Sequence, residues 1–342
     1  MDEVSHCAAI LNALRDPALI VNPEERVFAA NSAFRSLMPS ARVGETLPFV
    51  IRSPDIFDAV RRVLGGGKAE CANWREHVPV ERFFDVFVSP LEVESSERHA
   101  IITLRDLTEA RRIEQMRADF IANVSHELRT PLSSLLGFVE TLQGPAKDDP
   151  RARDKFLGIM REQGRRMSRL IDDLLSLSRV EQHQHLRPDT SVDLVSVIRH
   201  VVDGFSLIAH EHRVALTLDL PATLTVVGDR DELIRLAENL IGNAIKYGSL
   251  PNEDTRVEVS LAVIGAQIRL RVKDHGAGIA REHIPRLTER FYRVDAGASR
   301  TNGGTGLGLA LVKHIIMRHR GRLQITSTPN EGACFDAFLP LS

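Results

Sequence analysis

The sequence has 342 residues, which is long for one hydrophobic core and predicts two or three domains. Its 43% hydrophobic and 26% charged residues indicate a globular protein, and a net charge of -2 excludes the basic surface needed to bind nucleic acid or anionic lipid. The three cysteines lack the spacing of a metal site or disulfide framework, which fits a reducing compartment.

The sequence lacks the apolar run of about 18 residues that a membrane helix requires. Asp2 and Glu3 stand where a secretory signal would carry positive charge. We therefore expect a cytoplasmic chain without a membrane span. Recruitment to the inner membrane would need a partner or a segment outside this sequence.

Residues 1–107 are expected to form a small mixed domain. Short strands are predicted at 18–21 and 27–30, followed by a helix capped by Asn31. Ser53 and Pro54 open a further helix that ends at Gly65, and three more strands are expected near 71–78, 83–88 and 100–104. This order resembles a PAS sensor domain, which is an α/β fold.

The ligand of this PAS-like domain is left open by the sequence. Ser32 stands where a flavin photosensor would need a cysteine. Two histidines, His77 and His99, remain as alternative haem ligands, although histidines that serve only packing or solvation are several times more common.

From Thr108 the sequence predicts two long helices. Apolar residues of the first recur at steps of three, four or seven, the spacing of one helical stripe. Gly144 and Pro145 end this helix, and Asp149 caps a second amphipathic helix. One hairpin of this kind cannot bury its apolar stripe alone, so we expect a homodimer with a four-helix bundle. The stripe consists of Ile113, Met116, Phe120, Val124, Leu128, Leu135 and Leu142.

His126 lies on the first of these helices and points away from the stripe. At about 100° per residue it is roughly 200° from both Val124 and Leu128. Glu127 follows it directly, and Thr130 lies one turn further on the same face as His126. A lone histidine is usually an ordinary surface residue, so any role for His126 depends on its neighbours.

Residues 188–342 alternate between helix and strand patterns and predict an α/β sandwich with a mostly antiparallel sheet. One helix carries Asn239 and Asn243 on one face, with Lys246 and Tyr247 beside them. Amide oxygens are suitable ligands for Mg²⁺, and a lysine ammonium suits a phosphate. A simple polar helix face is an equally common explanation for this helix alone.

Two glycine-rich segments follow. The first places Asp274, Gly276 and Gly278 at a strand end, where a carboxylate accepts a hydrogen bond from an adenine amino group and glycines let the base approach. The second leads into a helix expected to reach Arg320, so its amides face a phosphate at the helix N-terminus. We expect the loop between residues 294 and 304 to be a lid. The second segment consists of Gly304, Thr305, Gly306, Leu307 and Gly308.

Together these motifs resemble the sensor histidine kinases of two-component systems. The string FIANVSHELRTP at 120–131 resembles their phosphoacceptor motif, and the nucleotide motifs resemble the ATP-binding domain shared with gyrase-type ATPases and Hsp90. GFVETLQGPA at 137–146 resembles the phosphate-regulon sensor kinases. The resemblance divides the chain into a PAS-like domain (1–107), a dimerisation and phosphotransfer hairpin (108–187) and a catalytic ATP-binding domain (188–342).

The resemblance implies ATP-dependent autophosphorylation of His126 and transfer to an aspartate of a response regulator, with ATP and Mg²⁺ as the cofactors. Glu127 would be the base, and Thr130 would orient water in a phosphatase reaction on the regulator. Asn243 and Asn239 would hold Mg²⁺. The nucleotide would be bound by Asn239, Asn243, Lys246, Tyr247, Asp274, Gly276, Gly278, Gly304, Thr305, Gly306, Leu307 and Gly308.

Two other functions remain open at this point. An ATPase of the gyrase or Hsp90 class would share the nucleotide motifs but would not need His126 and Glu127 on a helical hairpin. A non-catalytic dimeric scaffold would use the PAS-like domain to recruit partners.

Overall fold

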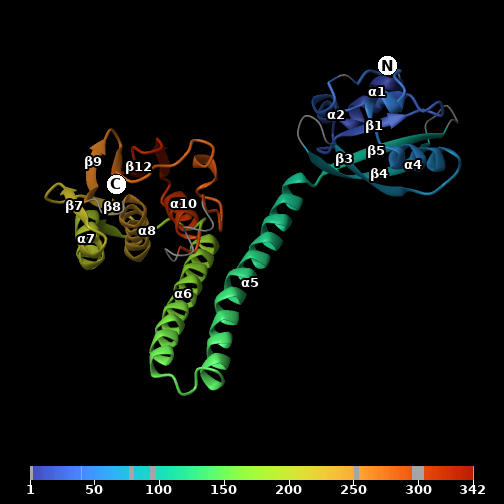
Figure 1. Cartoon of the computed structure of the whole chain (residues 1–342). Helices are drawn as coiled ribbons and strands as arrows, with labels where there is room; N and C mark the ends of the chain where they lie inside the picture. The colour runs from blue at the N-terminus through green and yellow to red at the C-terminus, as the bar shows by residue number, and fades with distance from the viewer. Residues whose placement is uncertain are drawn as a thin grey trace. The chain divides into compact units, whose positions relative to one another are not determined.

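The structure is a computed structural model that describes residues 3–39, 41–76, 81–92, 98–249, 254–294 and 304–341. It divides into two compact units, Met1–Ala122 and Asn123–Ser342, and one helix belongs to both (Figure 1). In the described ranges, every helix is too short or too polar to cross a bilayer. The predicted multidomain α+β class is confirmed.

The first unit contains a five-stranded antiparallel sheet in the order β2-β1-β5-β4-β3. Helices of this unit pack against it and enclose an apolar core. Its strands are β1 (Ala18–Val21), β2 (Val27–Ala30), β3 (Glu70–Glu76), β4 (Arg82–Glu92) and β5 (Arg98–Asp106), and its helices are α1 (Glu3–Leu11), α2 (Ser32–Leu37), α3 (Leu47–Val50) and α4 (Pro54–Leu64).

The strands and helix ends predicted for this unit are confirmed in the described residues, while residues 77 and 78 of the strand predicted at 71–78 lie outside them. Asn31 caps α2 by accepting a hydrogen bond from the Phe34 amide at 2.8 Å, and α4 begins at Pro54 and ends before Gly65. His99 is buried, and its ring meets the Phe28 ring edge-on at 4.8 Å. His77 lies outside the described residues.

Helices α5 (Thr108–Gln143) and α6 (Pro150–Gln182) form the predicted antiparallel hairpin (Figure 1). Asp149 caps α6 by accepting hydrogen bonds from the Arg151 and Ala152 amides at 2.9 and 3.1 Å. The Phe138 and Phe156 rings stack across the hairpin at 5.1 Å. Pro131 lies inside α5 and is the one buried residue of that helix.

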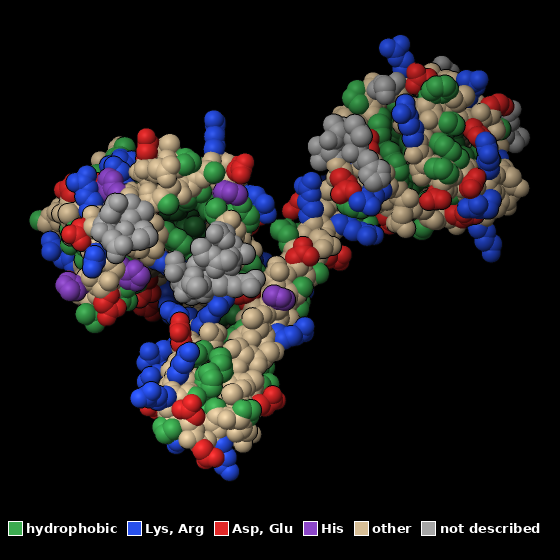
Figure 2. All heavy atoms as spheres, in the orientation of Figure 1, with side chains coloured by type: hydrophobic (Ala, Val, Ile, Leu, Met, Phe, Trp, Pro, Cys, Tyr) green, Lys and Arg blue, Asp and Glu red, His purple; other side chains and the backbone are tan. Residues whose placement is uncertain are grey.

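The hairpin leaves much of its apolar surface exposed to solvent in the single chain (Figure 2). This surface repeats at helical spacing on both helices, as expected for a face that packs on another helix. The most exposed large side chains within the second unit's part of the hairpin are Leu132, Leu136, Leu157, Ile171 and Leu175.

The rest of the second unit is a two-layer sandwich. A five-stranded sheet has the order β11-β12-β10-β9-β7, with only β7 and β9 parallel, and three helices pack on it. A separate ribbon pairs β6 (Ser191–Asp193) with β8 (Thr225–Val227). The sheet comprises β7 (Val214–Asp219), β9 (Thr255–Ile264), β10 (Gln267–Asp274), β11 (Arg322–Ser327) and β12 (Ala333–Pro340), and the helices are α7 (Leu194–Glu211), α8 (Arg230–Gly248) and α10 (Gly308–Arg318), with a short 3-10 turn, η1, at Ile284–Arg286.

Helix α10 ends at Arg318, two residues before the predicted end. Arg320 has a φ of 54°, which is incompatible with a continuing α-helix, and the amide of Gly321 bonds back to the Ile316 carbonyl at 2.8 Å. The C-cap residue, His319, is buried. Its Nε2 accepts a 3.1 Å hydrogen bond from the Asp229 amide, so the end of α10 is joined to the start of α8.

Candidate nucleotide and phosphoacceptor sites

His126 is exposed on α5, as its position relative to the apolar stripe predicts. The Thr130 hydroxyl donates a 3.2 Å hydrogen bond to the His126 backbone carbonyl, so these residues lie one turn apart on one side of the helix. Glu127 is oriented toward α6, where its Oε2 accepts a 3.3 Å hydrogen bond from Arg166 Nη2. The imidazole is therefore accessible to a second substrate.

Helix α8 presents its amide and lysine side chains opposite a buried face. Asp229 caps the helix by accepting hydrogen bonds from two amides at 3.1 and 3.2 Å. Asn239, Asn243 and Lys246 are half-buried on the other side of the helix. The buried face, which fixes this orientation, comprises Leu233, Leu236, Ala237, Leu240, Ile241, Ala244, Ile245 and Gly248.

Asp274 is only 4% exposed at the end of β10. Its Oδ1 accepts hydrogen bonds from the Gly276 amide at 3.0 Å and the Ala333 amide at 3.1 Å. Burial raises the pKa of this carboxyl, and the two amide donors oppose that shift. Because both bonds use Oδ1, the arrangement fixes the carboxylate without engaging Oδ2 in either bond.

The glycines lie where side chains would obstruct the site. A Cβ atom on Gly276 would be 2.1 Å from the Tyr247 carbonyl oxygen, so β10 and α8 approach each other only because this residue is glycine. Gly306 has a φ of 73°, and its carbonyl accepts a 2.8 Å hydrogen bond from the Phe291 amide. This bond joins the segment before the expected lid to the glycine-rich loop.

The start of α10 faces the polar side of α8. A Cβ atom on Gly308 would lie 2.2 Å from Asn239 Oδ1, and one on Gly304 would lie 2.8 Å from Lys246 Nζ. The Lys246 ammonium also lies over the Tyr247 ring, 4.7 Å from its centroid. The structure therefore brings the amide helix and the glycine-rich loop together around one site.

Thr305 has an unexpected partner. Its hydroxyl donates a 2.8 Å hydrogen bond to Asp173 Oδ2 on α6. Burial raises the pKa of the Asp173 carboxyl, while the hydrogen bond from Thr305 and the charge of Arg235 lower it. The sequence contains no signal for this contact, because Asp173 is an ordinary acidic residue of an amphipathic helix.

Glu181 makes a second connection between α6 and the C-terminal sandwich. Its Oε1 lies 2.6 Å from Arg290 Nη2 and 3.4 Å from His314 Nε2. Burial lowers the pKa of His314, whereas the Glu181 charge raises it. Acidic side chains of α6 thus contact the domain at two points.

The residues present fit a nucleotide with its metal. Amide oxygens at Asn239 and Asn243 are hard ligands of the kind that Mg²⁺ uses alongside phosphates, and Asn239 Oδ1 faces the start of α10. Within the described ranges there is no group of three or more His, Cys, Asp or Glu that would hold a metal alone. A cation here would therefore depend on the nucleotide phosphates for part of its coordination.

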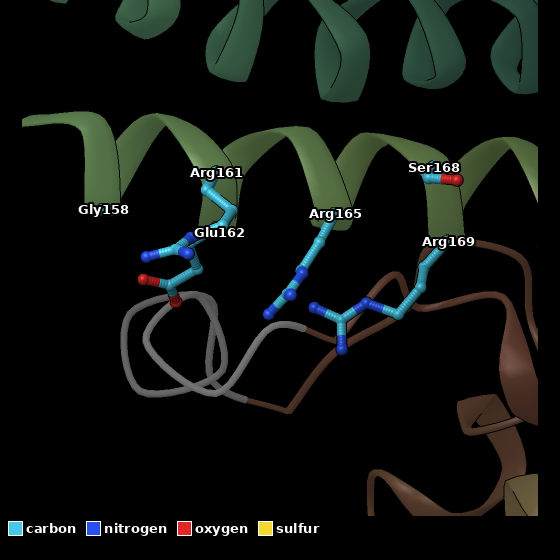
Figure 3. Close-up of a pocket in the computed structure, with 6 residues that line it drawn as sticks. All are labelled: Gly158, Arg161, Glu162, Arg165, Ser168 and Arg169. Atoms are coloured by element: carbon cyan, nitrogen blue, oxygen red, sulfur yellow. The ribbon is translucent and has the colours of Figure 1, made fainter.

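A separate pocket of about 670 Å³ lies along α6 (Figure 3). Three arginines spaced by four residues, Arg161, Arg165 and Arg169, project from one side of the helix. Its lining includes none of the predicted nucleotide residues. Its basic character also differs from the glycine and amide composition of the nucleotide site.

The predicted residues therefore form two groups in the structure. Asn239, Lys246 and Tyr247 of α8 meet the two glycine-rich segments, including Asp274. His126, Glu127 and Thr130 lie on α5, and no hydrogen bond or ion pair of the described residues links them to the nucleotide group. The expected lid lies almost wholly outside the described residues.

Three domain families match the chain in sequence order. Residues 11–112 match the PAS fold, and residues 116–183 match the His Kinase A (phospho-acceptor) domain. Residues 228–342 match the histidine kinase-, DNA gyrase B-, and HSP90-like ATPase family. His126 falls within the second match, and the whole nucleotide group falls within the third.

Two curated relatives align with much of the chain. The phosphate regulon sensor protein PhoR of Pseudomonas aeruginosa is 35% identical over 287 residues, which cover 79% of this chain and 64% of the relative. The sensor-like histidine kinase SenX3 of Mycolicibacterium smegmatis is 37% identical over 250 residues, covering 73% and 64%. The chain thus aligns with slightly less than two thirds of each relative.

Solved structures show the same architecture. Histidine kinase AdeS of Acinetobacter baumannii is 28% identical with a TM-score of 0.50, covering 64% of this chain and 98% of that one. Histidine kinase ThkA, solved in complex with response regulator protein TrrA, has a TM-score of 0.52 at 20% identity, covers 98% of both chains and supports the fold alone. With a PAS fold, a phosphoacceptor domain and this ATPase domain in order, the chain belongs to the sensor histidine kinase family.

Proposed function

We propose that this chain is an ATP-dependent protein-histidine kinase that phosphorylates its own His126. The observation that carries the proposal is an exposed histidine in a phosphoacceptor domain, within the same compact unit as the nucleotide group. An exposed imidazole is available to another domain or another protomer, whereas a histidine that serves packing would be buried.

In the proposed reaction, one imidazole nitrogen of His126 attacks the γ-phosphorus and the bond to the ADP oxygen breaks. The ring must lose the proton on its other nitrogen, and Glu127 accepts it. The products are phosphohistidine and ADP. Positioning and charge stabilisation supply most of the catalysis in such phosphoryl transfers.

The nucleotide would be held by the residues gathered between α8 and the glycine-rich segments. Asp274 would accept a hydrogen bond from the adenine amino group, Lys246 would lie by the phosphates, and Asn243 with Asn239 would bind Mg²⁺. The metal would neutralise phosphate charge. The amides from Gly304 to Gly308 would bind phosphate oxygens at the N-terminus of α10.

The phosphoryl group would then pass to an aspartate of a response regulator. Thr130, one turn from His126, would orient water for the opposing phosphatase reaction. The relationship to PhoR supports a role in phosphate-starvation signalling. We place the domain boundaries at residues 107 and 187.

A homodimer would cover the exposed apolar face of the hairpin. Leu132 and Leu136 on α5, and Ile171 and Leu175 on α6, are each more than 40% exposed in the single chain. Pairing two hairpins into a four-helix bundle buries such a face on both protomers.

The test is incubation of the purified chain with γ-labelled ATP and Mg²⁺, beside His126→Gln. The expected label is acid-labile, alkali-stable and absent from the variant. The matched control is His200→Gln, which changes an exposed histidine on α7 and should keep the label. Free phosphate without labelled protein would favour the ATPase alternative, and retained ATP binding with neither product would favour the scaffold.

A further inference from the structure

The contact between Glu127 and Arg166 connects the proposed base to the second helix of the hairpin. Arg166 Nη2 lies 3.3 Å from Glu127 Oε2, and the side chains are only 19% and 26% exposed. By comparison, the surface pair of Arg75 and Glu81 is 56% and 45% exposed. The Arg166 pair is thus shielded more from water, so its geometry is better defined than that of most exposed ion pairs.

This pair is also the single ion pair that joins α5 to α6 in the described part of the hairpin. The stacked rings of Phe138 and Phe156 pair the two antiparallel helices in the same register as this ion pair. Two independent contacts therefore set the same alignment of the helices, and Arg166 lies across from the turn that carries His126 and Glu127.

Arg166 engages one carboxylate oxygen through one nitrogen. That leaves Oε1 outside this hydrogen bond. A catalytic base works best when a third group orients it, because free rotation of the carboxylate would place its oxygens in many unproductive positions. His126 precedes Glu127 directly, so fixing Oε2 toward α6 restricts where Oε1 can lie.

We propose that Arg166 is a positioning residue for autophosphorylation: it holds Glu127 by one oxygen so that the other accepts the proton of His126. The inference rests on the proposed kinase function. In the reaction the proton moves from the imidazole to Glu127 while the phosphoryl group moves from ADP oxygen to the imidazole, and Arg166 exchanges no proton.

The first variant is Arg166→Gln. We expect the labelling rate at saturating ATP to fall about ten-fold, a part of what a general base contributes. The KM for ATP should change by less than about two-fold, because Arg166 is not among the nucleotide residues. Arg166→Lys keeps a cation near Glu127 and should restore much of the rate.

The second step is a double-mutant cycle with Glu127→Gln. If Arg166 acts through Glu127, Arg166→Gln should cause no further loss of rate in the Glu127→Gln background. A structural role would reduce the rate by the same factor in both backgrounds. The matched control is Arg165→Gln, an adjacent arginine whose guanidinium forms no ion pair with the described residues; its rate should equal that of the parent chain.

Additive effects in the cycle, or a faster rate in Arg166→Gln, would overturn the proposal. Melting temperatures of all variants identify any loss of folded protein, and Arg166→Lys provides the test if the glutamine variant does not fold. Absence of label on the parent chain would contradict the kinase function itself. If the parent chain is labelled but the rate losses of the two substitutions are additive, only the role of Arg166 is contradicted.

Discussion

The Thr305 hydroxyl in the glycine-rich loop donates a 2.8 Å hydrogen bond to Asp173 Oδ2 of α6. A residue expected to bind nucleotide is thus hydrogen-bonded to a carboxylate from the phosphoacceptor hairpin. The contact places a negative charge beside a loop whose expected ligand is also negative. Docking of α6 and binding of the nucleotide phosphates should therefore oppose each other.

Replacing Asp173 by asparagine should tighten ATP binding. The amide retains an oxygen that accepts from Thr305 but removes the charge, and one unit charge several Å away is worth about 1 kcal/mol, or roughly five-fold in Kd. Calorimetric titration with ATP and Mg²⁺ measures this change. Asp172→Asn removes the same charge from an exposed neighbouring position and is the control.

The gain in ATP affinity expected for Asp173→Asn should depend on pH. Burial raises the pKa of Asp173, so the carboxyl takes up a proton at a higher pH than an ordinary aspartate. The affinity difference between the parent and Asp173→Asn should be complete above that pKa and should shrink as pH falls through it. A difference that stays constant down to about pH 4, where an ordinary aspartate takes up its proton, would contradict the electrostatic explanation.

Asp274→Asn should weaken ATP binding by about 10- to 100-fold, as expected for the loss of a hydrogen bond to a charged group. The fixed Oδ1 would remain an acceptor for the Gly276 and Ala333 amides, which turns the new NH₂ group toward the site. An NH₂ group cannot accept from adenine. Fluorescent-nucleotide titration gives the Kd for each variant.

The control for Asp274 is Asp336→Asn. Asp336 is also 4% exposed in the same sheet, but it is paired with Arg271 at 2.7 and 2.8 Å. This change should lower the melting temperature and leave the Kd for ATP nearly unchanged. Equal losses of affinity in both variants would show that Asp274 only stabilises the fold.

His319 should make the nucleotide-binding domain less stable below neutral pH. Its Nε2 accepts from the Asp229 amide, and Nδ1 lies 2.8 Å from the Ile315 carbonyl oxygen, an arrangement that requires the neutral ring. Burial lowers the pKa of His319 below its ordinary value of about 6.5. The unfolded chain then binds more protons than the folded one, so stability is complete above about pH 6.5 and falls as pH decreases toward the folded-state pKa.

Urea unfolding at several pH values measures this slope, which for one histidine is at most about 1.4 kcal/mol per pH unit. His319→Gln should be less stable at pH 7.5, and its free energy of unfolding should lack the pH dependence that His319 contributes. Buried carboxyls with raised pKa values, such as Glu232, contribute with the opposite sign, so the comparison between variants isolates His319. His210→Gln, at an exposed position on α7, should keep the parent slope.

Leu136→Glu should convert the proposed dimer to a monomer. Leu136 is 55% exposed on the apolar face of α5, and burying a carboxylate in a bundle would cost far more than the leucine contributes. Light scattering coupled to size-exclusion chromatography gives the mass. Leu207→Glu changes a leucine that is 68% exposed on α7 and should leave the mass unchanged.

Local elements could be predicted because their signals lie within a few residues. The strands at 18–21 and 27–30 follow from short apolar runs on either side of a turn. The caps at Asn31, Asp149 and Asp229 follow from short side chains that accept backbone hydrogen bonds. The same applies to the orientation of His126, which depends only on helical spacing. The exposed position of His126 agrees with that expectation.

Contacts distant in the chain could not be predicted. Thr305 and Asp173 are 132 residues apart, and Asp229 and His319 are 90 apart. The parallel pairing of β7 with β9 likewise depends on which edge of the sheet remains available. The glycine motifs predict the nucleotide residues, but no short pattern distinguishes the α6 carboxylate that contacts Thr305.

Pro131 gives α5 a mechanical property in the turn that carries His126. Proline has no amide hydrogen, so the carbonyl of Glu127, four residues earlier, has no helical donor. A helix resists bending through these hydrogen bonds, and one is missing beside His126. The helix is therefore more compliant at this turn than along the rest of its length. A small force applied at either end would be expressed chiefly as a tilt of the turn that carries His126.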